Sequence, residues 1–136
     1  MKNYILILLA IFLVLRVQAI SSQQIGQSIQ ELESQLVKYE KEGNLLESAR
    51  CQSKLGFLYK DQENFSKSIE YFQKAIKSNE GLGNLNAVKN LCLNIGMMYT
   101  VQDNNDQALI YFEGERNIMT MARKSIKAPE IICFLT

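Results

Sequence analysis

The chain repeats itself in two consecutive blocks, residues 41–80 and residues 81–120. When one block is set over the other, nine positions are identical and the apolar character of many others is kept. The identical pairs are Gly43/Gly83, Asn44/Asn84, Leu45/Leu85, Gly56/Gly96, Tyr59/Tyr99, Gln62/Gln102, Asn64/Asn104, Tyr71/Tyr111 and Phe72/Phe112. A period of this length is typical of stacked units that cannot bury their apolar faces singly. It therefore favours an elongated repeat array over a single globular core.

Each repeat unit has the pattern of two helices. Apolar residues follow helical steps on both sides of a short polar break at residues 61–64, and Gly-Asn pairs at positions 43–44 and 83–84 separate one unit from the next. Glycine is the residue that most often ends a helix. We therefore expect an all-α fold with helices at about 45–60, 64–80, 85–101 and 105–122.

The spacing of small and aromatic residues resembles the tetratricopeptide repeat. The residues that carry the resemblance are Leu55, Gly56, Tyr59, Ser68 and Phe72 in the first unit, and Ile95, Gly96, Tyr99, Ala108 and Phe112 in the second. It implies an antiparallel helix-pair solenoid with two complete repeats, at about 45–80 and 85–122. It also implies structural roles for Gly56, Tyr59, Phe72, Gly96, Tyr99, Ala108 and Phe112: the glycines let paired helices approach, and the aromatics fill the space between pairs.

Several positions depart from that family pattern. Gln52 and Cys92 stand where the family often has tryptophan, the closing proline is absent, Asn105 replaces the aromatic seen at Phe65, and Gly114 lies inside an expected helix. The period of 40 also exceeds the usual value of about 34, and resembles the longer-helix variety of the family.

Incomplete units flank the two repeats within the expected domain, residues 20–136. Residues 24–41 place apolar side chains one period before those of the helix at 64–80, which predicts either the second helix of a leading pair or an N-terminal cap. Residues 125–136 predict the start of a third pair, because Pro129 marks a helix start. The apolar ridge of Ile131, Ile132, Phe134 and Leu135 would then lack its cover. We expect self-association through this end, and we interpret the chain as a truncated part of something longer.

Residues 1–19 have the pattern of a signal peptide. An apolar run from Tyr4 to Leu15 follows Lys2, and Val17-Gln18-Ala19 offers the small residues that precede cleavage. This predicts a secreted or periplasmic protein. A membrane anchor is the alternative, although Arg16 ends the run well short of the roughly 20 residues that span a bilayer. The membrane would be a partner only through an uncleaved leader.

Composition argues against most kinds of chemistry. The 15 basic and 14 acidic residues are interspersed, so no basic footprint for nucleic acid is expected. The chain has no histidine, which removes the usual activation of serine or cysteine nucleophiles and the common imidazole ligands of zinc. Cys51, Cys92 and Cys133 are interpreted as buried small side chains, of which at most one pair could bridge. We expect no catalytic residues, no metal and no cofactor.

What remains is a binding surface. In tetratricopeptide arrays the first helix of each pair lines a concave groove, and the resemblance assigns to that groove Arg50, Ser53, Lys54, Phe57, Lys60, Asn90, Leu93, Asn94, Met97 and Thr100. We therefore expect an exported module that binds a protein or peptide partner there. The alternative is the sensory ectodomain of a truncated membrane-bound regulator, with a kinase or DNA-binding output.

Overall fold

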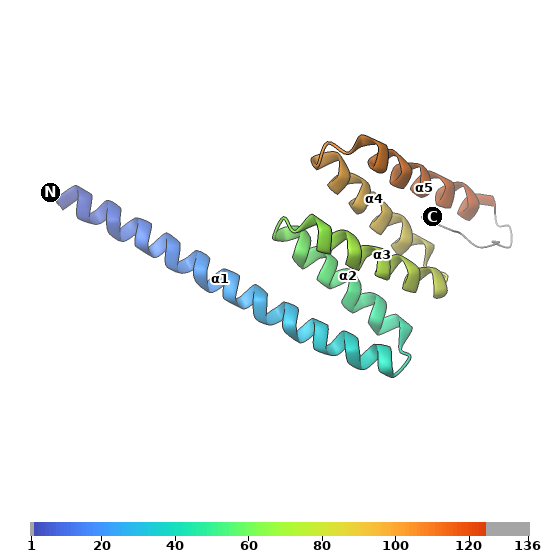
Figure 1. Cartoon of the computed structure of the whole chain (residues 1–136), viewed down its shortest axis with the longest axis horizontal. Helices are drawn as coiled ribbons and strands as arrows, with labels where there is room; N and C mark the ends of the chain where they lie inside the picture. Colours follow the sequence, from blue (N-terminus) through green and yellow to red (C-terminus); the bar gives the residue numbers. More distant parts are fainter. Residues whose placement is uncertain (1, 125–136) are drawn as a thin grey trace.

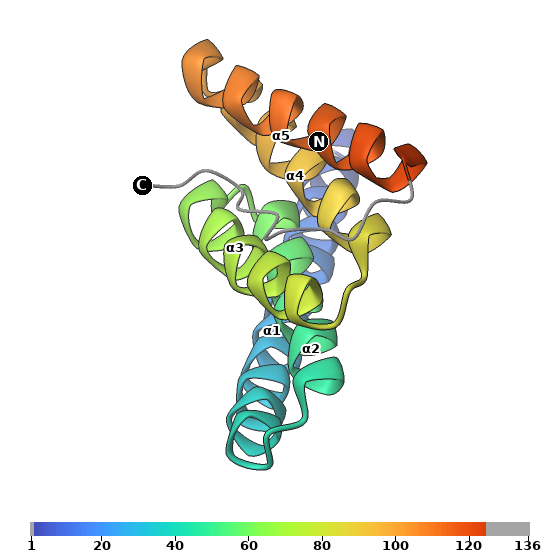
Figure 2. The same ribbon diagram turned by 90° about the vertical axis from the view of Figure 1, so that its right-hand side faces the viewer.

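The computed structural model describes residues 2–124, with side chains described at 5–19, 23–114 and 116. All secondary structure in this described part is helical, and each helix packs on its neighbours in the chain (Figure 1). This confirms the expected all-α helix-pair solenoid. The helices are α1 (Lys2–Lys41), α2 (Leu45–Asp61), α3 (Phe65–Gly81), α4 (Leu85–Val101) and α5 (Asn105–Lys124). Viewed from the side, they stack in chain order from α1 and α2 to α5 (Figure 2).

The four turns between helices share one design. An asparagine precedes each of α2 to α5, and its side-chain oxygen accepts a hydrogen bond from the backbone N–H three residues on. The residue before each asparagine has a positive φ: Gly43, Glu63, Gly83 and Asp103. Such a left-handed residue ends a helix, and the asparagine caps the next one. This turn therefore occurs twice in each repeat, whereas the Gly-Asn pair occurs once.

Within a pair, the second helix crosses the first at a glycine. A Cβ added to Gly56 would lie 2.5 Å from Cε1 of Phe72, and one added to Gly96 would lie 2.5 Å from Cε1 of Phe112. The hydroxyl of the fully buried Ser68 donates a 2.7 Å hydrogen bond to the Gly56 carbonyl at the same crossing. Phe72 also belongs to the buried cluster that joins α3 to α4 of the next pair, so its ring packs against the glycine of its own pair and also fills space between pairs.

The core forms two buried clusters. One joins α3, α4 and α5, and the other joins α1 to α2. The larger one contains Ile69, Phe72, Ala75, Ile76, Val88, Leu91, Cys92, Ile95, Met98 and Tyr111. Cys51 and Cys92 are both buried, as predicted for small core side chains, and Cys133 lies outside the described residues. Phe65 is partly buried and packs against the larger cluster.

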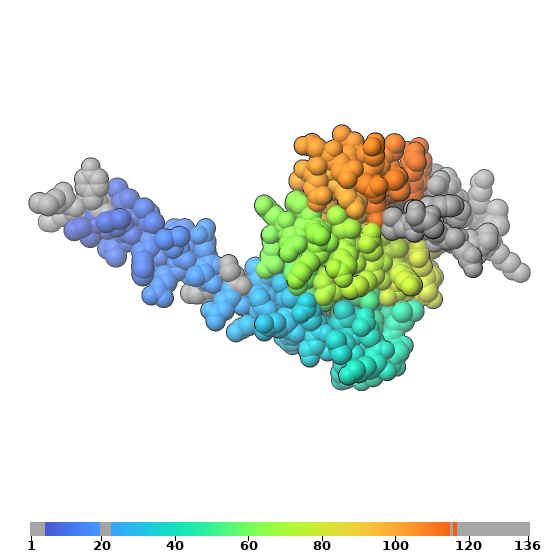
Figure 3. Space-filling model, viewed as in Figure 1, coloured from blue at the N-terminus to red at the C-terminus, as the bar shows by residue number. Residues whose placement is uncertain are grey.

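Helix α1 runs without a break from the apolar N-terminal segment into the array. In its second half, Ile29 and Leu36 pack with Cys51 and Leu55 of α2. The first half projects away from the body as a separate rod (Figures 1 and 3), with the apolar side chains from Ile5 to Val17 mostly exposed. By length and composition α1 could cross a membrane, a test that a signal sequence also passes. The expected third pair at 125–136 lies outside the described residues.

Candidate partner-binding face

The ten residues assigned to the groove lie on the two first helices, α2 and α4. We call them together the first-helix face. Their side chains are accessible: seven are exposed, and Ser53, Lys60 and Asn94 are partly buried. The exposed ones are Arg50, Lys54, Phe57, Asn90, Leu93, Met97 and Thr100.

One hydrogen bond joins the two halves of this face. The Lys60 ammonium on α2 donates to the side-chain oxygen of Asn94 on α4 at 3.0 Å. The Asn94 side-chain nitrogen in turn donates to the Asn90 carbonyl at 2.8 Å. The same ammonium lies 5.1 Å from the centre of the Phe57 ring, within the range of a cation–π contact. Lys60, Asn94 and Phe57 are thus held together as one unit across successive repeats.

The face also presents large apolar side chains to solvent. Phe57 is 41% exposed even though its ring packs edge-on against Phe72, with ring centres 4.9 Å apart. On α4, Leu93 is 40% exposed and Met97 is 56% exposed. Exposed apolar side chains bordered by polar groups are typical of surfaces that bind other proteins. Phe57, Leu93 and Met97 are therefore the apolar part of the first-helix face.

Three predicted members of the face are already engaged locally. The Ser53 and Thr100 hydroxyls donate to carbonyls in their own helices, those of Ala49 and Gly96. Arg50 forms a 2.7 Å ion pair with Glu47. Hydroxyl bonds of this kind leave little donor capacity for a ligand. The available chemistry therefore concentrates on Lys54, Phe57, Lys60, Leu93 and Met97.

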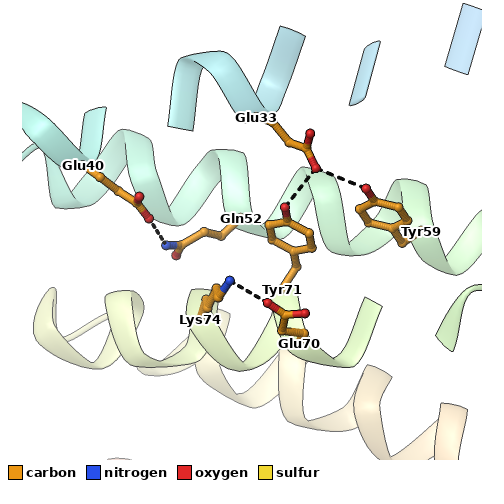
Figure 4. Close-up of polar contacts among 7 residues, drawn as sticks. All are labelled: Glu33, Glu40, Gln52, Tyr59, Glu70, Tyr71 and Lys74. Atoms are coloured by element: carbon orange, nitrogen blue, oxygen red, sulfur yellow. Dashed lines mark hydrogen bonds and ion pairs between the residues drawn. The ribbon is translucent and has the colours of Figure 1, made fainter. Parts of the chain in front are cut away.

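A second polar cluster, which the sequence analysis missed, ties α1 to the first repeat. One carboxylate oxygen of Glu33 accepts hydrogen bonds from the hydroxyls of Tyr59 at 3.2 Å and Tyr71 at 3.1 Å (Figure 4). The two tyrosine rings are stacked, with centres 5.5 Å apart. Burial raises the pKa of the Tyr71 phenol well above its usual value, and the hydrogen bond to the Glu33 carboxylate and its charge raise it further. We call Glu33, Tyr59 and Tyr71 together the Glu33 lock, because their hydrogen bonds hold α1 against the first repeat.

The lock has a counterpart in the next repeat. Gln73 is the equivalent of Glu33, one repeat period later in the chain. Its side-chain amide donates a hydrogen bond to the Tyr111 hydroxyl at 2.8 Å. The Tyr99 and Tyr111 rings are stacked as well. Helix α1 therefore occupies the place before α2 that α3 occupies before α4. A signal for this was present in the sequence, because Tyr59 and Tyr71 repeat as Tyr99 and Tyr111.

Metal-binding chemistry and the reactivity of Cys51 can be assessed for the described part of the chain. Among the described residues, no group of three or more His, Cys, Asp or Glu side chains could hold a metal ion. Burial raises the pKa of the Cys51 thiol, an effect that nearby Lys54 partly opposes. A thiol in its neutral form is a poor nucleophile. We therefore interpret Cys51 as a packing residue.

Antiparallel helix pairs, stacked with glycine crossings and a shared first-helix face, define a helical repeat protein. Residues 49–81, covering most of α2 and all of α3, match the family model for the tetratricopeptide repeat. The chain therefore contains a segment that matches the tetratricopeptide repeat, and such repeats typically serve as non-enzymatic scaffolds for protein–protein interaction. No curated protein matches the chain, and no solved structure does.

Proposed function

We propose that the protein is an exported interaction module that binds a peptide or protein segment on the first-helix face. The observation that supports this is the continuous group of Phe57, Lys60 and Asn94, bordered by the exposed Leu93 and Met97. Buried apolar anchors with polar neighbours provide most of the binding energy in protein interfaces. The apolar leader that begins α1 supports export.

The test uses the full chain, expressed with its own N-terminal segment. The protein is purified in mild detergent in the form that the cells produce, whether or not that segment has been cleaved. Random dodecamer peptides displayed on phage are selected against it, and binders are measured again against Met97→Glu. Lys77→Glu, a change at an exposed position on α3, is the control. We expect selected peptides to lose at least tenfold in affinity with Met97→Glu and to keep it with Lys77→Glu. Equal binding by both variants would place the interaction elsewhere.

The alternative is a sensory ectodomain that stays attached to the membrane. The uninterrupted helix α1 supports it, because a retained leader would couple the bilayer directly to the Glu33 lock and the first repeat. Mass spectrometry of the cell-derived protein distinguishes the two. A chain that begins at Ile20 favours the exported module, and an intact chain in the membrane fraction favours the sensor.

We also propose that the last described helix supports self-association. Leu109 on α5 is 54% exposed, whereas Ile69, its equivalent on α3, is only 8% exposed in the cluster shared with α4. An exposed apolar side chain of this size would gain by burial against a second copy. Light scattering across concentration tests this. Leu109→Glu should keep the chain monomeric at concentrations where the parent associates, and unchanged association would exclude this face.

A further inference from the structure

We propose that the segment bound on the first-helix face is acidic, with an apolar side chain placed between carboxylates. This inference rests on the proposed function, because it names the partner chemistry of the same surface. It is carried by the charge of the face, by the order of side chains along α2, and by the composition of α4.

Positive charge is concentrated on this face. It holds three of the chain's 15 basic residues and none of its 14 acidic ones, so the rest of the chain carries a small negative excess. Helix α4 contains Lys89 but no aspartate or glutamate along its whole length. Because Glu47 pairs with Arg50, the charges left over on the face are those of Lys54 and Lys60. No carboxylate in the described part of the chain forms an ion pair with either lysine.

The order of side chains along α2 alternates charge and ring. Lys54, Phe57 and Lys60 follow one another at steps of three positions, which places them along one side of a helix. The Lys60 ammonium lies over the Phe57 ring and is held by Asn94. Since Asn94 is a neutral acceptor, it orients Lys60 without cancelling its charge. A ligand that matches this stripe carries a carboxylate toward each lysine and an apolar side chain between them.

The rest of the surface favours a peptide over other anionic partners. Nucleic-acid binding depends on many phosphate contacts, and two uncompensated lysines provide few of them. The centre of the face is apolar, with Phe57 41%, Leu93 40% and Met97 56% exposed. Charge-assisted hydrogen bonds to carboxylates, combined with an apolar anchor, give both direction and affinity to a peptide. An acidic, partly apolar polypeptide segment therefore fits both properties of the face.

The experiment reads the composition of peptides selected from the random library and then measures their affinity by fluorescence anisotropy. We expect the winners to combine Asp or Glu with Leu, Ile, Met or Phe. Replacing the acids of a winner by Gln or Asn should weaken binding about tenfold. Lys54→Gln and Lys60→Gln should each weaken it about fivefold, and raising NaCl from about 0.05 to about 0.5 M should weaken it further. Lys77→Gln on α3 removes the same charge away from the face and should change nothing.

Each other outcome overturns the inference in an identifiable way. Neutral or basic winners that still depend on Met97, but not on Lys54 or Lys60, would refute the acidic partner and leave the proposed function intact. Selected peptides whose affinity depends neither on Met97 nor on Lys54 and Lys60 would refute both the acidic partner and the proposed function. A library that yields no binding peptides would also refute both. Circular dichroism of each variant verifies that the helices are retained, so that a loss of binding reports on the surface.

Discussion

The ring of Phe72 packs against Gly56 so closely that the pair has no room for a Cβ, since such an atom would lie 2.5 Å from ring carbon Cε1. The same relationship recurs in the next repeat between Gly96 and Phe112. These crossings set how closely the two helices of each repeat approach.

Substituting the crossing glycines should therefore destabilise the array. We expect Gly56→Leu and Gly96→Leu each to lower the free energy of unfolding by about 2 kcal/mol or more, because the added side chain forces the paired helices apart. Urea denaturation followed by circular dichroism measures the change. Gly114 provides the control, because a Cβ there meets nothing within 4 Å. Gly114→Ala should stabilise the helix by about 0.5 to 1 kcal/mol. Unchanged midpoints at positions 56 and 96 would contradict the packing.

Two of the four turns hold a residue that is poorly suited to its backbone. Glu63 and Asp103 have φ of 58° and 56°, where the equivalent turns use Gly43 and Gly83. We expect Glu63→Gly to stabilise the chain by about 0.5 to 1 kcal/mol, since glycine adopts this conformation without a steric penalty. Gly83→Ala, the reverse change in the same type of turn, should destabilise by a similar amount. Thermal unfolding measures the melting temperature of both variants, which should rise for Glu63→Gly and fall for Gly83→Ala. A shift of both melting temperatures in the same direction would contradict the role proposed for these turn residues.

The lock between Glu33 and Tyr71 should make stability fall at alkaline pH. The folded chain raises the Tyr71 pKa above its ordinary value of 10.0, so the neutral phenol is the form that folding favours. Its contribution is complete below pH 10 and is lost as the pH rises from 10 toward the folded pKa. Tyr71→Phe should cost about 1 kcal/mol at pH 7 through the lost hydrogen bond and flatten the alkaline decline.

Glu33→Gln serves as the partner variant for this test. It keeps an oxygen acceptor but removes the charge, so the Tyr71 pKa should fall toward its usual value. Tyrosinate absorbance during a pH titration, together with urea midpoints at pH 7 and pH 10.5, measures both effects. An alkaline decline in Tyr71→Phe as steep as that of the parent would assign it to other groups.

The sequence predicts the repeat skeleton because local signals recur. The Gly-Asn pairs and the spacing of Gly56, Tyr59 and Phe72 predict helix ends and crossings that the structure reproduces closely. The asparagine caps were visible as repeated identities at 44/84 and 64/104, yet their role becomes clear only when all four turns are compared. These features depend on neighbours close in the chain.

What the sequence does not predict depends on contacts between distant residues. Glu33 meets Tyr59 and Tyr71 at sequence separations of 26 and 38, and only the register of α1 on the first repeat brings them together. Gln52 stands in a position where the family often has tryptophan. It is buried, and its side-chain amide accepts a hydrogen bond from the Ser78 hydroxyl at 2.8 Å. The same amide donates to the Glu40 carboxylate at 3.4 Å (Figure 4). The burial of a polar side chain in a core position can be explained only when its hydrogen-bond partners are known.

The measurement that most directly tests partner binding on the first-helix face uses two adjacent methionines. Met97 is 56% exposed on this face, and Met98 is 3% exposed in the core behind it. Methyl NMR of the 13C-labelled methionines, recorded while a selected peptide is titrated, reports on both sides at once. We predict a progressive shift of the Met97 methyl signal with little change at Met98. A peptide that binds with the expected affinity and leaves the Met97 signal unmoved would contradict it.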